Sequence, residues 1–138
     1  MTPVFVDTAA WIALFDASDR LAPAARQVLL SLQQARQPLL TSEFVLLELA
    51  AAFAAPAFRQ GIIRFINALS TLPEVRIEAA HPHWYQAGWQ VYQHRLDKAW
   101  SLTDCISIAI MQHYRLTDAF TSDRHFEQAG FRRLLLAP

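Results

Sequence analysis

The chain has 138 residues, of which 54% are hydrophobic and 17% charged, and it contains only three glycines. This length fits one domain, residues 1–138, and the composition excludes long disordered or low-complexity stretches. Twelve basic residues balance twelve acidic ones, so the net charge provides no general attraction to a polyanion. Eleven of the twelve basic residues are arginines, which favour directed contacts with phosphate or carboxylate groups.

No segment of the sequence is typical of secretion or membrane insertion. The first apolar run, Val4–Val6, ends at Asp7 and lacks the basic and hydrophobic regions of a secretory signal. The apolar stretch Phe44–Ala55 is too short to cross a bilayer and contains Glu48. The single cysteine, Cys105, fits a small core residue in a reducing compartment. We therefore expect a cytoplasmic protein without membrane contact.

The predicted elements alternate between short strands and helices. In chain order they are a strand over residues 3–6, helices over 11–15 and 22–34, a strand over 38–41, helices over 42–55 and 58–69, a strand over 75–78, helices over 83–95 and 101–114, and strands over 119–122 and 132–136. Ser42 is a candidate cap for the third helix, and Pro56 is expected to end that helix. This alternation predicts right-handed crossovers and a parallel sheet with helices on both faces.

Four acidic residues are candidates for a functional site. Asp7 and Asp123 follow the first and fourth predicted strands, and ligands of such open sheets bind beyond the carboxyl ends of the strands. Glu48 and Asp104 lie among apolar residues in helices, where a carboxylate is costly unless it is paired. Converging carboxylates repel one another, so the cluster makes sense with a divalent cation. Hard oxygen ligands indicate Mg²⁺ or Mn²⁺.

Each of these acids also has a structural alternative. Asp7 can cap the helix that follows it, and Asp104 fits a capping box with Ser101. Glu48 can pair with an arginine, and Asp123 can be an ordinary turn residue.

The remaining acids are assigned structural or surface roles. Glu43 lies five residues before Glu48, so the two project about 140° apart on a helix and only one can face the site. We assign Glu43 to the helix start, where an acid meets the helix dipole favourably. Asp97 is expected to be a solvated loop residue. The other acids are interpreted as surface, loop or turn charges: Asp16, Asp19, Glu74, Glu78, Asp118 and Glu127.

Several segments share a family pattern. They are Val-Asp-Thr-Ala at 6–9, Glu48 within its apolar helix, Ser-Leu-Thr-Asp-Cys-Ile-Ser at 101–107, and Thr-Ser-Asp-Arg-His-Phe at 121–126 followed by Gly130 and Phe131. Together they resemble the PIN-domain family and, more narrowly, the VapC-type toxins of type II toxin–antitoxin pairs. The resemblance runs from Val4 to about Leu135, and the two carboxyl-terminal segments are its most specific part.

The resemblance implies a three-layer α/β/α fold with a five-stranded, mostly parallel sheet. It also implies a Mg²⁺-dependent endoribonuclease, with Mn²⁺ able to substitute, that acts on RNA. Frequent homodimers and a small antitoxin protein, whose tail enters the acidic cleft, are implied as partners. The acids of the family correspond to Asp7, Glu48, Asp104 and Asp123, with Thr121 as a neighbour.

Histidine chemistry and aromatic stacking on bases are alternatives with weaker support. His83 and His94 lie about three helical turns apart, so they share a helix face without sharing a site. His125 is interpreted as an exposed histidine at a helix start rather than a phosphate ligand. Tryptophans 84, 89 and 100 are expected to serve packing rather than base stacking.

Other function classes remain open. A phosphate-accepting receiver domain needs paired acids after its first strand, whereas Asp7 is followed by Thr8, and the third predicted strand ends in Glu78. A PIN-fold protein can also have a non-toxin role, in RNA processing or as a non-catalytic binding module. The apolar segments Leu49–Ala57 and Phe58–Leu69 are candidate docking surfaces for such a module.

Overall fold

The strands of the protein are short and form one sheet. In the computed structural model, which describes residues 1–136, they are β1 (Val4–Val6), β2 (Leu39–Ser42), β3 (Val75–Glu78), β4 (Asp118–Phe120) and β5 (Arg132–Arg133). Their order is β3-β2-β1-β4-β5, and every neighbouring pair is parallel. Every residue of β1 and β2 is buried: β1 is entirely apolar, as expected for a strand covered on both faces, whereas β2 ends in two buried polar residues, Thr41 and Ser42. The predicted domain, 1–138, extends two residues beyond the described part.

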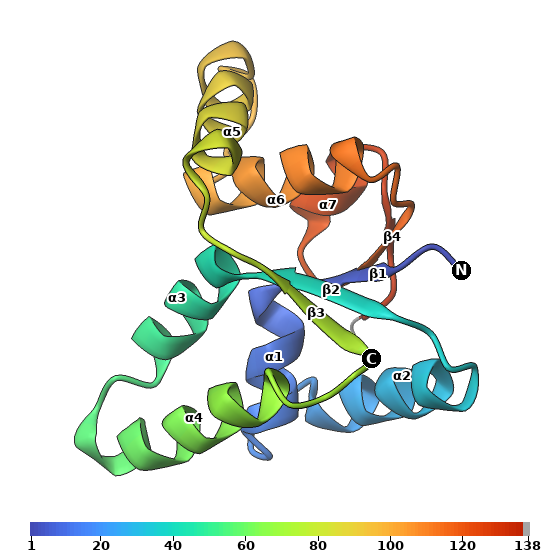
Figure 1. Ribbon diagram of the computed structural model, residues 1–138, viewed down its shortest axis with the longest axis vertical. Helices are drawn as coiled ribbons and strands as arrows, with labels where there is room; N and C mark the ends of the chain where they lie inside the picture. Colours follow the sequence, from blue (N-terminus) through green and yellow to red (C-terminus); the bar gives the residue numbers. More distant parts are fainter. Residues whose placement is uncertain (137–138) are drawn as a thin grey trace.

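Helices cover both faces of this sheet. They are α1 (Thr8–Phe15), α2 (Ala22–Gln34), α3 (Glu43–Ala52), α4 (Pro56–Leu69), α5 (Pro82–His94), α6 (Leu102–His113) and α7 (Arg124–Gln128). Figure 1 shows α1, α2 and α4 below the sheet and α6 and α7 above it, with α5 packed on α6. The three-layer α/β/α fold with a five-stranded parallel sheet is therefore confirmed. Among residues 1–136, no helix is long and apolar enough to span a membrane.

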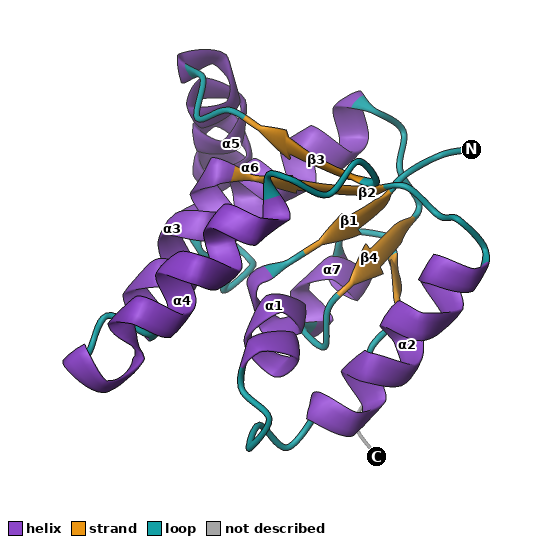
Figure 2. Ribbon diagram, turned by 60° about the horizontal axis from the view of Figure 1, so that its bottom comes forward, coloured by secondary structure: helices purple, strands orange, loops and turns teal. Residues whose placement is uncertain are grey.

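The topology fixes where ligands can bind. The chain runs from β1 to β2 and β3 on one side, then returns to place β4 and β5 on the other side of β1 (Figure 2). The strand order therefore reverses between β1 and β4, and the crevice beyond their carboxyl ends is the usual binding site of such sheets. Asp7 comes directly after β1, and the segment 121–123 follows β4.

Several predicted boundaries were wrong for local reasons. Pro56 does not end the third helix: α3 ends at Ala52, and Pro56 occupies the first turn of α4, where its missing N–H costs nothing. Helix α1 begins at Thr8 instead of residue 11. Strand β4 ends at Phe120, and the next residues lead into α7, a short helix for which the sequence predicted a start near His125 but no bounds.

The approach of α5 to α6 depends on one glycine. A Cβ atom built at Gly88 would lie 2.2 Å from Cγ1 of Ile106, so any larger residue would push the two helices apart. This close packing holds α5 against α6, and the short segment between them places the first turn of α6 beside the sheet.

Candidate metal centre

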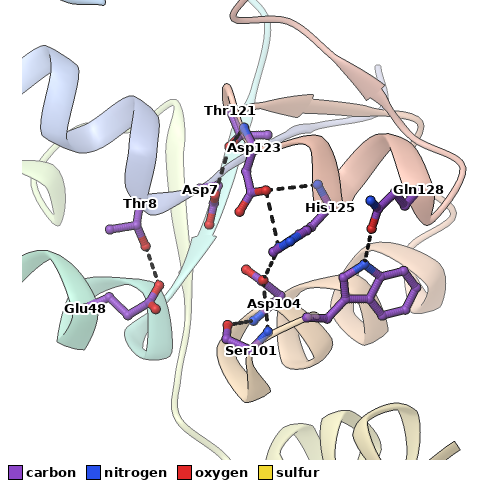
Figure 3. A network of polar contacts seen from close by, with 10 residues as sticks. Asp7, Thr8, Glu48, Ser101, Asp104, Thr121, Asp123, His125 and Gln128 are labelled. Carbon is purple, nitrogen blue, oxygen red and sulfur yellow. Dashed lines mark hydrogen bonds and ion pairs between the residues drawn. The ribbon is translucent and has the colours of Figure 1, made fainter. Parts of the chain in front are cut away.

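The four predicted acids lie around one cleft. Asp7, Glu48, Asp104 and Asp123 all line a cavity of about 450 Å³, which Thr8 and Ser101 also line. Figure 3 shows Glu48 on one side of this cleft and the three aspartates on the other, although the four come from separate segments of the chain. The structure therefore brings these carboxylates together at the carboxyl edge of the sheet, as the sequence predicts. We call this cavity the acidic cleft.

Asp7 is the most deeply buried member, with 5% of its surface exposed. Burial raises its pKa to about 7, and the nearby charges of Asp104 and Glu48 add to this effect, while a hydrogen bond from Thr121 partly offsets it. The Thr121 hydroxyl donates to Oδ2 of Asp7 over 2.8 Å, which confirms the predicted neighbour. Asp7 occupies the N-cap position of α1, but its side chain makes no capping hydrogen bond. Side-chain capping therefore does not explain this residue.

Glu48 projects from the middle of α3 toward α1. Its Oε1 accepts a hydrogen bond from the Thr8 hydroxyl over 2.6 Å. Partial burial raises the pKa of Glu48, and the negative charges of Asp104 and Asp123 act in the same direction. Within the described residues it has no arginine partner, so the ion-pair alternative was wrong.

Glu43 points elsewhere, as its angular separation from Glu48 predicts. It lies in the first turn of α3, and its Oε1 accepts a hydrogen bond from the backbone N–H of Ala80 over 2.7 Å. Its role is structural, because it ties the start of α3 to the segment that follows β3.

Asp104 combines a capping role with a place in the cleft. Its backbone N–H donates to Oγ of Ser101, and its Oδ2 accepts from the Ser101 N–H, which together form the predicted capping box. The same Oδ2 lies 2.8 Å from Nδ1 of His125. Capping and a position in the cleft are therefore compatible, because both contacts use one oxygen and leave the other.

Asp123 begins α7. Its Oδ1 accepts the backbone N–H of His125 over 2.9 Å, and its own N–H donates to the Thr121 hydroxyl oxygen. Since Thr121 also donates to Asp7, and His125 also contacts Asp104, the segment 121–125 connects three of the four acids. Asp123 is therefore more than an ordinary turn residue.

The hydrogen bonds leave a regular pattern of unused oxygens. The well-formed bonds fall on Oδ2 of Asp7, Oε1 of Glu48, Oδ2 of Asp104 and Oδ1 of Asp123. The second oxygen of each carboxylate remains for a ligand, and no lysine or arginine of residues 1–136 forms an ion pair with any of the four. Oriented, uncompensated carboxylates of this kind fit a hard divalent cation.

Two contributors were missed at the sequence level. The prediction that His125 is an exposed histidine at a helix start was incomplete: its side chain is 30% exposed, and its ring bridges two acids. Asp104, Asp123 and His125 each offer a ligand atom within 4.8 Å of the others. Thr8, which orients Glu48, had only one sequence signal, its place directly after Asp7.

The acidic cleft is not the largest hollow of the described residues. A hollow of about 600 Å³ lies between α1, α2 and α4, is lined mainly by apolar side chains, and contains none of the four acids. Chemistry rather than size therefore identifies the acidic cleft as the candidate site.

Comparisons with known proteins agree with this geometry. The family model named PIN domain matches residues 4–132. Among solved structures, the chain is similar to VapC20 of Mycobacterium tuberculosis, described as a Sarcin-Ricin loop cleaving toxin. The two share 25% sequence identity with a TM-score of 0.80, over 93% of this chain and 95% of that one. A search among curated proteins gave no match. The resemblance recognised in the sequence is thus confirmed, and the chain belongs to the PIN-domain family.

Proposed function

We propose that this protein is a Mg²⁺-dependent endoribonuclease that hydrolyses RNA phosphodiester bonds, with Mn²⁺ able to replace Mg²⁺. One observation carries this proposal: four carboxylates surround one cleft, each with an oxygen that accepts no well-formed hydrogen bond, and no lysine or arginine of the described chain neutralises them. Membership of the PIN-domain family supports the same reading.

The residues present fit a hard divalent cation. The donors are carboxylate oxygens, which Mg²⁺ and Mn²⁺ prefer, and no cysteine lines the cleft. Asp7, Glu48, Asp104 and Asp123 would hold the ion, which, when bound, supplies Lewis-acid stabilisation of phosphate charge and a more acidic water. The raised pKa values of Asp7 and Glu48 result first from burial and to a smaller extent from the neighbouring negative charges, and a bound cation would favour the ionised form of both.

The chain itself orients these ligands. Thr121 holds Asp7, Thr8 holds Glu48, and the Ser101 N–H holds Asp104. His125 restrains Asp104 through its ring and Asp123 through its backbone N–H. Such neighbours fix the rotamers of ligands before the cation arrives, which reduces the reorganisation needed on binding.

The proposed biological role is the toxin of a toxin–antitoxin pair. This extends to the present chain what the description of VapC20 says of that protein, namely that it is a toxin that cleaves an RNA loop. A cognate antitoxin whose tail enters the acidic cleft, a homodimer and a cytoplasmic location complete the proposal. Four acids in a cleft suit a basic tail, because the tail would replace the neutralising cation.

Cleavage of RNA by the purified chain tests the enzymatic proposal. We expect endonucleolytic products with Mg²⁺ or Mn²⁺, none with a chelator, and a loss of at least about 100-fold in rate for Asp104→Asn, because one ligand is neutralised. Asp16→Asn is the matched control, since Asp16 is a half-buried acid at the end of α1, outside the cleft, and the amide oxygen of asparagine can still accept from Ser18. Activity that survives Asp104→Asn or the chelator would refute metal-dependent cleavage.

Co-expression tests the toxin role separately. We expect the product of a short neighbouring reading frame to co-purify with the chain and to relieve growth arrest caused by its expression. An active nuclease that neither arrests growth nor binds such a product would instead support a PIN-domain enzyme of RNA processing. A chain that cleaves no RNA would support the non-catalytic alternative.

A further inference from the structure

Helix α5 carries a row of aromatic rings on one exposed face. Ring centroids of Tyr85 and Trp89 lie 6.3 Å apart with planes 6° from parallel, and those of Trp89 and Tyr92 lie 5.6 Å apart at 21°. Tyr85 is 42% exposed and Tyr92 is 44% exposed. Spacings of four and three residues put the rings on successive turns of the same face. We call these three residues the aromatic ladder.

The packing of α5 does not account for the ladder. The helix buries Trp84 and Gly88, and Gly88 lies against Ile106 of α6. Trp84 and Trp100 are 4% and 5% exposed, which confirms the packing role predicted for these two tryptophans. The ladder lies beside this contact, so three large rings stack on one another while two of them remain open to solvent. Exposed aromatic surface of this extent is typical of a binding site.

The charge around the ladder suits a polyanion. Residues 79–96 contain no aspartate or glutamate, although the whole chain has twelve acidic residues. The same segment contains three histidines, three glutamines and Arg95. At the end of α5, the Arg95 guanidinium lies 4.8 Å from the ring centroid of Trp100. Beyond α5, the exposed Asp97 pairs with Arg95 and Lys98, so these two cations and one acid leave a net positive charge at the end of the ladder. Aromatic rings beside cationic and amide groups, with no acid on the helix itself, are the combination found where single-stranded nucleic acid binds.

The ladder leads toward the acidic cleft. Tyr92, its last ring, lines a hollow of about 350 Å³ together with Lys98, Trp100 and Cys105. Cys105 directly follows Asp104, and both Asp104 and Ser101 line the acidic cleft. The hollow at the end of the ladder and the acidic cleft are therefore lined by adjacent residues of the first turn of α6. From Tyr85 to Tyr92 the helix rises about 10 Å, enough for one or two bases.

We propose that the aromatic ladder is a stacking platform for unpaired bases of an RNA whose scissile phosphate lies in the acidic cleft. This inference rests on the proposed ribonuclease function and adds a binding surface for unpaired bases outside the acidic cleft. A second copy of the chain is the competing occupant of this face. RNA is favoured because the face lacks acids and continues into the acidic cleft.

Binding of a defined RNA tests the platform. The probe is a fluorescein-labelled, unstructured oligoadenylate of twelve nucleotides, and the readout is fluorescence anisotropy with Mg²⁺ in an Asp7→Asn background that prevents cleavage. We expect Trp89→Ala to weaken binding about tenfold, the effect of losing one stacked base. Trp89→Phe should keep most of the affinity, whereas Trp89→Leu, which is apolar without a π face, should resemble Trp89→Ala.

Controls separate stacking from other effects. Phe58→Ala removes a ring on α4 that is 48% exposed, and it should leave binding unchanged. Circular dichroism melting shows whether each variant is folded. Equal affinities for Trp89→Ala and its background would overturn the platform, while cleavage by the unmodified chain would still support the nuclease. Sedimentation tests the competing occupant. If Trp89→Ala converts a dimer to a monomer while Trp89→Leu keeps the dimer, and RNA affinity is unaltered in both, this face binds a second copy. That result would likewise overturn the inference.

Discussion

Two acidic residues follow strands at the same edge of the sheet and have opposite environments. Glu78 ends β3, and both of its oxygens are used: Oε1 contacts Arg76 and the Tyr114 hydroxyl, and Oε2 accepts from the Trp84 indole. Burial acts to raise the pKa of Glu78, but the hydrogen bond from Tyr114 and the charge of Arg76 outweigh it and lower that pKa. Asp7, which follows β1, has one hydroxyl donor and a pKa of about 7.

The difference separates an acid whose oxygens are all used by the protein from one that keeps capacity for a ligand. A carboxylate that is saturated with donors lowers the free energy of the folded chain and has no capacity left for a ligand. A carboxylate that is buried with too few donors costs free energy, and a protein retains it where a ligand later supplies the missing charge. The position of Glu78 at the edge strand, apart from the acidic cleft, also argues against the receiver-domain alternative.

The largest expected effect is on stability at Asp7. In metal-free protein at pH 8, Asp7→Asn should increase the free energy of unfolding by about 2 to 4 kcal/mol, because it removes a buried charge whose pKa is raised by about three pH units. The amide oxygen of asparagine can still accept from Thr121. Urea denaturation in a chelator measures the change. A loss of stability would show that the carboxylate is better compensated than its surroundings indicate.

The pH dependence of this effect has a definite sign. The folded-state pKa of about 7 exceeds the ordinary value of 3.8, so between these pH values the folded protein binds more protons than the unfolded chain. The contribution of Asp7 to stability is therefore complete below pH 4 and is lost as the pH rises through 7, by about 1.4 kcal/mol per pH unit. The advantage of Asp7→Asn should vanish near pH 4 and be full at pH 8. Glu48 is present in both proteins, so its titration largely cancels. A constant difference across this range would contradict the assignment to Asp7.

Sequence reasoning located the four acids of the cleft better than the groups that hold them. Asp7 and Asp123 could be found because the carboxyl ends of parallel strands meet at one edge, and Glu48 and Asp104 because a carboxylate among apolar helix residues needs a partner. The roles of Thr8 and His125 depend on contacts across 40 and 21 residues, which no local pattern encodes. Helix α7 was implied only by the helix start expected at His125 and had no predicted bounds, because it has five residues and is stabilised by the Asp123 cap rather than by an apolar period.

Substitution of Glu78 is expected to change stability in the opposite direction to Asp7→Asn. Glu78→Gln should decrease the free energy of unfolding by about 1 to 2 kcal/mol, since it weakens hydrogen bonds to a mostly buried carboxylate whose side chain is 14% exposed. Stabilisation by Mg²⁺ and the rate of RNA cleavage should both remain those of the parent. Thermal melts with and without Mg²⁺ provide the test. A lost response to Mg²⁺ would mean that this acid belongs to the functional site after all.

The smallest expected effect is at Thr8, which orients Glu48, an acid of the cleft that has few donors, as Asp7 has. The Thr8 hydroxyl is the one side-chain donor that Glu48 has within the described residues, so Thr8→Val, of nearly equal shape, leaves this carboxylate free to rotate. Losing such an orienting neighbour weakens metal binding by about tenfold in comparable sites. Calorimetric titration with Mn²⁺ should show this loss for Thr8→Val and near-parental affinity for Thr8→Ser, because serine keeps the hydroxyl and valine keeps only the bulk. If valine binds Mn²⁺ as tightly as threonine, Glu48 is oriented by the packing of α3 alone. If serine fails to restore the affinity, packing of the methyl group against α3 matters more than the hydrogen bond.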